Sequence, residues 1–193
     1  MSVPVVRVRA VTVLSREALV AAVAAGKRFE YFFFWGHTPG DAEVDKWCLS
    51  QWWPAEFTVD GVRYRSAEQF MMAEKARLFG DAEAEKLILA SETPAEAKKL
   101  GRAVREFDQE TWVARRFDIV VRGNEAKFGQ DERLREFLLS TGDQVLVEAA
   151  PRDVIWGIGL GAANPRAADP ASWRGRNLLG FALMAARDTL RAG

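Results

Sequence analysis

The sequence contains few of the residues that metal sites and catalytic triads need. Among 193 residues there is one cysteine, Cys48, and one histidine, His37. A single cysteine excludes an internal disulfide, and the two residues together supply too few soft ligands for a typical zinc site. A Ser-His-Asp triad would require His37, but no Gly-x-Ser-x-Gly motif is present, and residues 35–39 are typical of a loop after a strand. We therefore expect neither a metal nor a cofactor.

An excess of one charge and a long apolar run are also missing. Lysine plus arginine equals aspartate plus glutamate, at 27 each. This balance argues against non-specific binding of nucleic acid, because such binding requires an excess of positive charge. No segment reaches the roughly 18 apolar residues of a membrane span. Residues 17–26 are rich in alanine, but Glu17 at their start favours a helix over a signal peptide. We expect no membrane association and a cytoplasmic location.

One helix carries a carboxylate and an amine on the same side. Ser66 with Gln69 three residues later is a capping-box start, and neither glycine nor proline interrupts residues 66–79, so this segment is predicted to be helical. Glu68 and Lys75 then point in nearly the same direction, about 10 Å apart along the axis. Apolar residues flank both, and charges placed there cost free energy unless they are paired or used. A half-exposed helix whose Lys75 extends to solvent would give the same pattern.

The rest of the chain predicts an α+β fold, mostly helical, as a single domain with a small sheet. Asp60-Gly61 between two short apolar runs is a strong hairpin signal, and capping residues and glycine stops predict the other helices. The predicted helices are residues 15–26, 81–90, 93–101, 108–128, 132–140 and 177–192; the predicted strands are 5–14, 29–35, 56–59, 62–64 and 144–148, with 38–48 as a polar loop.

A long loop and the segment after it are candidates for anion binding. Residues 157–172 are rich in glycine, alanine and proline and too long for an ordinary connection, which favours a functional loop. Arg174, Gly175, Arg176 and Asn177 follow, where a helix N-terminus with free N–H groups and two arginines would suit a phosphate. An exposed turn with Asn177 as a plain helix cap would fit the same residues.

Tryptophans and one aspartate complete the candidate site. Seven tryptophans are many for this length. Trp52 and Trp112 are either core residues or flat faces on which a nucleobase stacks. Asp153 precedes Trp156 and Gly157 at the entrance of the long loop, so it is either a site residue or the cap of its own backbone turn.

Together these segments resemble the NADAR (YbiA-like) N-glycosidase family over about residues 29–191. The resemblance rests on several blocks in the family's order, which are Phe33-Phe34-Trp35-Gly36-His37, Leu49-Ser50-Gln51-Trp52, residues 66–76, Trp112, Asn124-Glu125-Ala126-Lys127-Phe128, Asp153 with Trp156-Gly157-Ile158-Gly159, and Trp173-x-Gly175-x-Asn177-x-Leu179-Gly180. It implies a YbiA-like fold, with residues 1–28 as an N-terminal extension and 29–193 as the family domain.

The resemblance also implies hydrolysis of an N-glycosidic bond between ribose and a base-like amine. Family substrates include ribosylamino-pyrimidine phosphates related to riboflavin synthesis and, for some members, ADP-ribose attached to guanine, so ADP-ribosylated nucleic acid is a further candidate partner. Glu68, Trp112 and Asp153 fall on positions that the family uses for activity, and Lys75 falls on the lysine that some members use as a nucleophile. The substrate-binding candidates are Trp52, Trp112, Trp156, Gly157, Arg174, Gly175, Arg176 and Asn177.

Two chemical routes stay open. One uses two carboxylates and a water through an oxocarbenium-like state; in the other an amine attacks C1′ and forms a Schiff base once the ring opens. We favour Lys75 as the nucleophile, because its apolar flanks would desolvate the amine and lower its pKa. Glu68 would then move the proton and Asp153 would hold ribose hydroxyls or the water. The alternatives are a non-catalytic ADP-ribose or nucleotide reader and an interaction module with solvated charges.

Overall fold

The computed structural model describes residues 13–36 and 44–193, and it has the mostly helical α+β architecture that the sequence predicts. His37 and residues 5–12 of the predicted first strand lie outside the described residues. The helices are α1 (Arg16–Ala24), α2 (Ala67–Leu78), α3 (Ala82–Ala90), α4 (Pro94–Arg102), α5 (Gln109–Gly129), α6 (Glu132–Ser140) and α7 (Leu178–Ala192), with short 3-10 helices η1 (Lys46–Leu49), η2 (Pro165–Ala168) and η3 (Pro170–Ser172). The strands are β1 (Tyr31–Phe34), β2 (Phe57–Val59), β3 (Val62–Tyr64) and β4 (Val145–Glu148).

Local signals place the helix starts and the hairpin correctly. The side chains of Ser15, Ser66 and Thr93 each accept the backbone N–H three residues further on, which fixes the starts of α1, α2 and α4. Strands β2 and β3 form the predicted hairpin. Asp60 and Gly61 both take positive φ, 51° and 77°, as a two-residue turn of type I′ requires.

The second sheet joins segments that no local pattern connects. Strand β1 pairs in parallel with β4, and Phe34 lies opposite Glu148 in the register. Helices α2 to α6 lie between the two strands in the sequence. One expectation nearby was wrong: residues 46–48, the end of the predicted polar loop 38–48, form η1 together with Leu49, because Cys48 and Leu49 are fully buried in the core.

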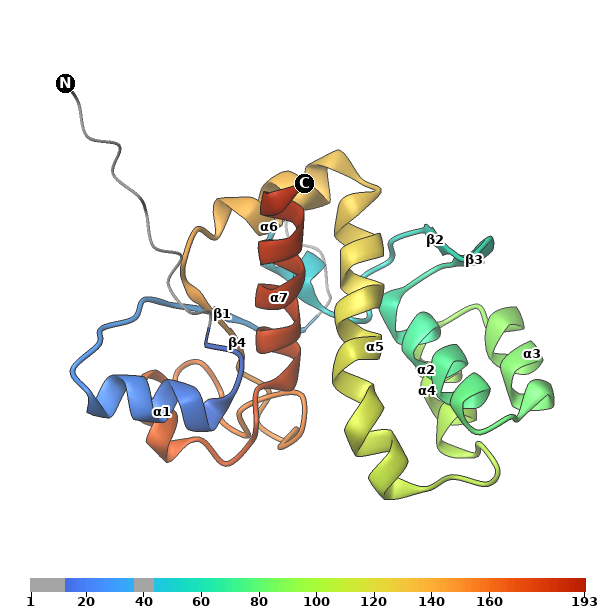
Figure 1. Cartoon of the computed structure of the whole chain (residues 1–193), viewed down its shortest axis with the longest axis horizontal. Helices are drawn as coiled ribbons and strands as arrows, with labels where there is room; N and C mark the ends of the chain where they lie inside the picture. Colours follow the sequence, from blue (N-terminus) through green and yellow to red (C-terminus); the bar gives the residue numbers. More distant parts are fainter. Residues whose placement is uncertain (1–12, 37–43) are drawn as a thin grey trace.

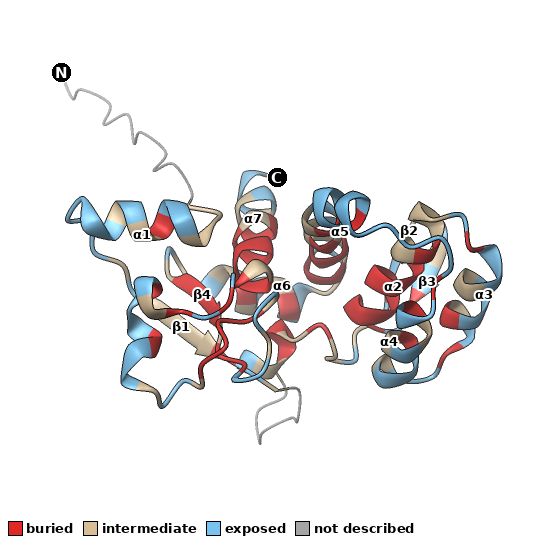
Figure 2. Ribbon diagram, turned by 90° about the horizontal axis from the view of Figure 1, so that it is seen from below, coloured by how far each residue is buried: buried red, intermediate tan, exposed pale blue. Residues whose placement is uncertain are grey.

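The helices form a row in which the long helix α5 takes the centre. Figure 1 shows α5 and α7 side by side, with α2, α3 and α4 on one side of α5 and the β1–β4 sheet on the far side of α7. The turned view in Figure 2 keeps the same order and shows the buried faces of α2, α5 and α7 turned inward. Although α2 and β4 lie on different sides of α5 and α7 in this view, the charge of Glu68 at the start of α2 acts on Glu148 at the end of β4.

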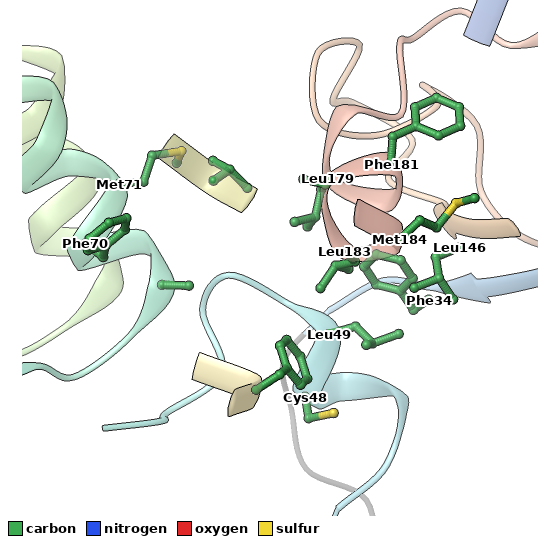
Figure 3. Packing of buried hydrophobic residues seen from close by; sticks show 14 of the residues in the cluster. Phe34, Cys48, Leu49, Phe70, Met71, Leu146, Leu179, Phe181, Leu183 and Met184 are labelled. Atoms are coloured by element: carbon green, nitrogen blue, oxygen red, sulfur yellow. The ribbon is translucent and has the colours of Figure 1, made fainter. Parts of the chain in front are cut away.

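The sheet and α7 approach each other closely, and a glycine makes this possible. Phe34 and Leu146 of the two strands belong to the same core cluster as Leu183 and Met184 of α7 (Figure 3). A Cβ atom at Gly180 would stand 2.0 Å from the Leu146 carbonyl oxygen. Any other residue at this position would push α7 away from β4.

The N-terminal segment packs onto the rest of the domain. Leu19 of α1 is fully buried, and Arg16 donates hydrogen bonds to the carbonyl oxygens of Pro170 and Ala171 at 3.0 and 2.9 Å. The division into an extension of residues 1–28 and a domain of residues 29–193 stays a prediction. Among the described helices, none combines the length and the apolar character that crossing a membrane requires.

Candidate active site

Glu68 lies in the first turn of α2 because the Ser66–Gln69 capping box fixes where that helix begins. Ser66 Oγ accepts the Gln69 N–H at 3.2 Å, and Gln69 Oε1 accepts the Arg65 N–H at 2.8 Å. Glu68 is 3% exposed. Its carboxylate accepts a hydrogen bond from the Trp52 side chain, while Oε1 is sealed from solvent and has no partner among the described residues. Such unpartnered buried oxygens are rare and call for a functional explanation.

The Glu68 carboxyl titrates near neutral pH. Its pKa is raised to about 7, and burial is the main cause. The positive charges of Lys98 and Arg102 and the bond from Trp52 act against this shift, and the negative charge of Asp153 adds to it. A carboxyl group with such a pKa can both give and take a proton at neutral pH, as general acid–base catalysis requires.

Glu148 at the end of β4 is half-buried but carries a second carboxyl group with a sealed oxygen, and it was not among the candidates predicted from the sequence. Its Oε2 is sealed from solvent without a partner among the described residues. Its pKa is raised to about 8, first by burial and then by the negative charges of Asp153 and Glu68, against the positive charge of Lys98. A carboxylate at the last position of a buried strand was the available signal, because ligands of parallel sheets bind at the carboxyl ends of strands.

Asp153 caps its own turn and also acts on the two buried carboxyl groups. Its Oδ1 accepts the N–H groups of Ile155 and Trp156, both at 2.8 Å, so it does cap its own turn. Its charge also raises the pKa of Glu68 and of Glu148. The structure therefore brings three carboxyl groups from α2, β4 and the following loop into one region. In the described part of the chain, no three His, Cys, Asp or Glu side chains are grouped as a metal ion would need.

The start of α7 differs from the expected anion site. The N–H groups of residues 174–179 all donate to carbonyl oxygens of residues 154–158, at 2.9 to 3.3 Å, so they are not free for a phosphate. Gly175 is needed for this contact, since a Cβ atom there would stand 2.1 Å from the Gly157 carbonyl oxygen. Trp156 is half-buried on the same loop, and Arg174 and Arg176 are exposed.

Asn177 is neither a plain helix cap nor open to a ligand. It is fully buried, and its side chain makes no capping hydrogen bond to α7. Instead Oδ1 accepts the Glu148 N–H at 2.9 Å and Nδ2 donates to the Leu146 carbonyl oxygen at 2.8 Å. Asn177 thus fixes the end of β4, and with it Glu148, against the start of α7.

Lys75 lies at the other end of α2, away from Glu68. Its Nζ donates to the Gly101 carbonyl oxygen at 2.7 Å and stands 4.2 and 5.8 Å from the ring centres of Phe107 and Trp112. Burial lowers the pKa of Lys75, so the side chain does not simply extend into water. No hydrogen bond or ion pair joins Lys75 to Glu68. Helix α4 links the two ends, with Gly101 at Lys75 and with Lys98 and Arg102 acting on Glu68.

The segment that carries Trp52 is held by α5. Lys127 Nζ donates to the carbonyl oxygens of Cys48 and Ser50 at 2.6 and 2.8 Å, and Asn124 Nδ2 donates to Gln51 Oε1 at 3.0 Å. The Lys98 Nζ stands 5.6 Å from the centre of a Trp52 ring. These contacts hold the 49–52 block against the 124–128 block in the folded protein.

A cavity of about 310 Å³ beside α2 lies apart from these groups. It is lined by Pro54, Ala55, Glu56, Arg65, Ser66, Gln69, Ser91, Glu92, Thr93 and Pro94. The Gln69 amide nitrogen already donates to the Ile88, Leu89 and Ser91 carbonyl oxygens. The carboxyl groups that titrate near neutral pH are elsewhere, and we place the reaction with them.

The two raised carboxyl pKa values should make the protein less stable as the pH rises. Glu68 and Glu148 keep their protons in the folded state up to about pH 7 and 8, whereas an unfolded glutamate releases its proton near the model value of 4.5. Their contribution to the free energy of unfolding is therefore fully present below pH 4.5 and is lost as the pH rises through 7 to 8. For Glu68 it amounts to about 3 kcal/mol. Urea unfolding of the parent at pH 5 and pH 8 measures the loss.

The variants Glu68→Gln and Glu148→Gln should each lose less stability between pH 5 and pH 8 than the parent. Glu83→Gln, which changes an exposed glutamate on α3, should keep the parent's loss. Burial lowers the pKa of Lys127 to about 7, so Lys127 makes the folded state more stable as the pH rises above 7. This effect is the same in the parent and in all three variants. Equal slopes in all four would contradict the assigned pKa shifts.

Known proteins are similar to this chain in sequence and in fold. The sequence model of the NADAR domain matches residues 33–191. An N-glycosidase of Acanthamoeba polyphaga mimivirus is 43% identical over 164 residues, covering 82% of this chain and 95% of that protein. An N-glycosidase of Nostoc punctiforme is 32% identical, covering 75% and 85%. The solved NMR structure of E. coli YbiA is similar with a TM-score of 0.68 and 25% identity, covering 86% and 88% of the two chains.

The match over residues 33–191 shows that this chain belongs to the NADAR domain family. It is an enzyme of the N-glycosidase type, as the expectation from the sequence had it. A riboflavin biosynthesis protein of Vibrio vulnificus is also similar, at 30% identity over 74% of this chain, although the match covers only 35% of that protein.

Proposed function

We propose that this protein hydrolyses the bond between C1′ of a ribose and the amine nitrogen of a base. The observation that carries the proposal is the Glu68 carboxyl, which is buried, has an unpartnered oxygen and has a pKa raised to about 7. Breaking a C1′–N bond requires that the leaving nitrogen be protonated. A carboxyl group that holds its proton near neutral pH can supply that proton.

Lys75 is the proposed nucleophile. Its unprotonated amine attacks C1′ as the C1′–N bond breaks, and the leaving nitrogen takes a proton from Glu68. The carboxylate left on Glu68 takes a proton from the nitrogen now bonded to C1′ and returns it to the ring oxygen, so that the ring opens to a Schiff base between Lys75 and C1′. Water adds to the Schiff base, releases the sugar as the aldehyde and restores the amine. Burial lowers the pKa of Lys75, which supports this role because only the neutral amine is nucleophilic. The two residues start about 10 Å apart along α2, so the Lys75 and Glu68 side chains would extend toward each other to reach C1′ and the nitrogen bonded to it.

The remaining residues would position the substrate. Asp153 uses Oδ1 for its own turn, and we assign Oδ2 to the ribose hydroxyls or to the water. Trp112 lies under the Lys75 amine and would form the wall of the site. Glu148, with its pKa raised to about 8, would enter the reaction protonated, so that it donates a hydrogen bond instead of repelling Glu68.

Two substrate classes fit this chemistry, ribosylamino-pyrimidine phosphates and ADP-ribose attached to guanine, as a nucleotide or within a nucleic acid. Similarity to a protein named for riboflavin biosynthesis supports the first class. A non-catalytic reader of ADP-ribose has less support, because a binding module has no need of a buried carboxyl group that titrates near neutral pH. A cytoplasmic location stays a prediction.

A two-substrate panel tests the function. Purified protein is incubated with a ribosylamino-pyrimidine phosphate and, separately, with an ADP-ribosylated guanine nucleotide, and the free base and free sugar phosphate are measured by liquid chromatography. Release of base and sugar in equal amounts from at least one substrate is the expected result, because hydrolysis yields one of each. Release from neither, by protein that unfolds cooperatively, would contradict the proposal.

A further inference from the structure

Arg116 on α5 is a buried cation that has no hydrogen-bond or ion-pair partner among the described residues. Three cationic side chains are almost fully buried in the described residues: Arg116, Lys127 and Arg187, at 5%, 1% and 2% exposure. Lys127 donates to two carbonyl oxygens, and Arg187 donates to Thr141 Oγ1 and the Gln144 carbonyl oxygen. Arg116 makes no hydrogen bond or ion pair with any described residue. A buried guanidinium group is ordinarily paired, since leaving it unpaired is costly.

The charge that acts on Arg116 has the same sign as its own. Burial lowers the pKa of Arg116, and the positive charge of Arg176 lowers it further. Arg176 precedes α7, which packs against α5, and its N–H donates to the Val154 carbonyl oxygen at 3.1 Å. Its backbone is therefore fixed on the loop that follows Asp153. Two arginines held close together without an acidic partner repel each other, and an anion bound between them removes that repulsion.

The position of Arg116 relates it to the proposed active site. Arg116 lies four residues after Trp112 on α5, so the two share one face of the helix about 6 Å apart along its axis. Trp112 in turn lies beside the Lys75 amine. Arg176 lies on the segment that packs against residues 154–158. Those residues directly follow Asp153 in the chain. Arg116 is thus one helical turn from the tryptophan beside Lys75, and Arg176 lies on the segment packed against the turn that Asp153 caps.

We propose that Arg116 and Arg176 bind the phosphate group attached to the 5-oxygen of the substrate's ribose. The guanidinium fork matches phosphate geometry, and two arginines match the charge of a phosphate dianion. This assignment rests on the proposed function for the identity of the sugar, and it replaces the helix N-terminus of α7 as the anion site. Both substrate classes carry a phosphate at this oxygen, as a terminal group or as part of a diphosphate.

Binding of product-like probes tests the site without catalysis. Isothermal titration with ribose 5-phosphate, ADP-ribose and unphosphorylated ribose is applied to the parent, Arg116→Met, Arg176→Met and Arg115→Met. Arg115 is the exposed neighbour of Arg116 on the same helix, so its variant matches the change in charge and residue type. We expect Arg116→Met and Arg176→Met to weaken phosphate-dependent binding about ten- to a hundredfold, and Arg115→Met to leave it unchanged.

A stability measurement separates binding from a structural role. An arginine that supports the fold would lower the unfolding temperature when replaced, whereas an unpaired buried charge should not. We expect Arg116→Met to unfold at the parent's temperature or above it. Saturating ribose 5-phosphate should raise the unfolding temperature of the parent and not that of Arg116→Met, because only the parent gains from ligand linkage.

The outcomes divide cleanly. If the parent binds ribose 5-phosphate more tightly than ribose and Arg116→Met loses that difference, the site binds a terminal phosphate. If Arg116→Met weakens the binding of ADP-ribose alone, the site binds a diphosphate. Parent-like affinity for both phosphorylated probes in Arg116→Met, or an equal loss in Arg115→Met, would overturn the site. If the panel shows no hydrolysis while the Arg116-dependent binding persists, the proposed reaction fails and the phosphate site stands.

Discussion

The variant Glu68→Gln is expected to lower kcat by about 10²- to 10⁴-fold, the usual contribution of a general acid or base. Glutamine keeps the size of the side chain and can still accept the bond from Trp52, but it cannot carry the proton that the leaving nitrogen needs. KM should change little, because the interaction is made in the transition state. Steady-state kinetics on the substrate that the parent cleaves fastest measures both constants.

The pH profile gives a second readout for Glu68. With its pKa raised to about 7, the parent's kcat/KM should show an ionisation near that pH, and Glu68→Gln should lack it. Glu83→Gln on the exposed side of α3 is the matched control and should keep the parent's kinetics. A Glu68→Gln enzyme with more than about a tenth of the parent's kcat would remove Glu68 from proton transfer.

The variant Lys75→Ala should lose activity on the order of a hundredfold or more, because the positioned amine that attacks C1′ is gone. Affinity for ribose 5-phosphate should stay close to that of the parent. In the parent, borohydride added during turnover should reduce the Schiff base to a stable adduct. Peptide mass spectrometry should then find the sugar on Lys75.

Two comparisons make the lysine experiment decisive. Lys86→Ala, which removes an exposed lysine from α3, should keep full activity and still form the adduct on Lys75. If Lys75→Ala stays nearly as fast as the parent and the parent forms no adduct, water attacks C1′ directly. Glu68, Asp153 and Glu148 would then be the groups that carry the reaction.

Part of the candidate site was open to prediction because its signals are local. The Ser66–Gln69 capping box, the helical spacing of Glu68 and Lys75, and the Asp60-Gly61 turn each involve residues within about two helical turns of one another. Hydrogen bonds and dihedral angles at these positions agree with the prediction. The apolar neighbours of Glu68 in the sequence left both a buried and a half-exposed carboxyl open, and the structure shows that it is buried.

Other site features depend on segments that meet only in the folded chain. Glu148 was predicted as the end of a strand, and its raised pKa comes from burial and from Asp153 and Glu68. Arg116 looks in the sequence like an ordinary charged position on a long helix. Its lack of an acidic partner and its closeness to Arg176 follow from the packing of α5 against α7.

The sequence by itself determined the helices, the hairpin, the NADAR membership and the candidates Glu68, Lys75 and Asp153, because capping, periodicity and motif blocks are carried by neighbouring residues. The tertiary structure alone decided the parallel pairing of β1 with β4, and it showed that the N–H groups at the start of α7 are used by the 154–158 loop. It also decided which charges are left unpaired. The physical reason is that desolvation and hydrogen-bond partners come from every segment packed around a group, and the order of residues along the chain does not contain that packing.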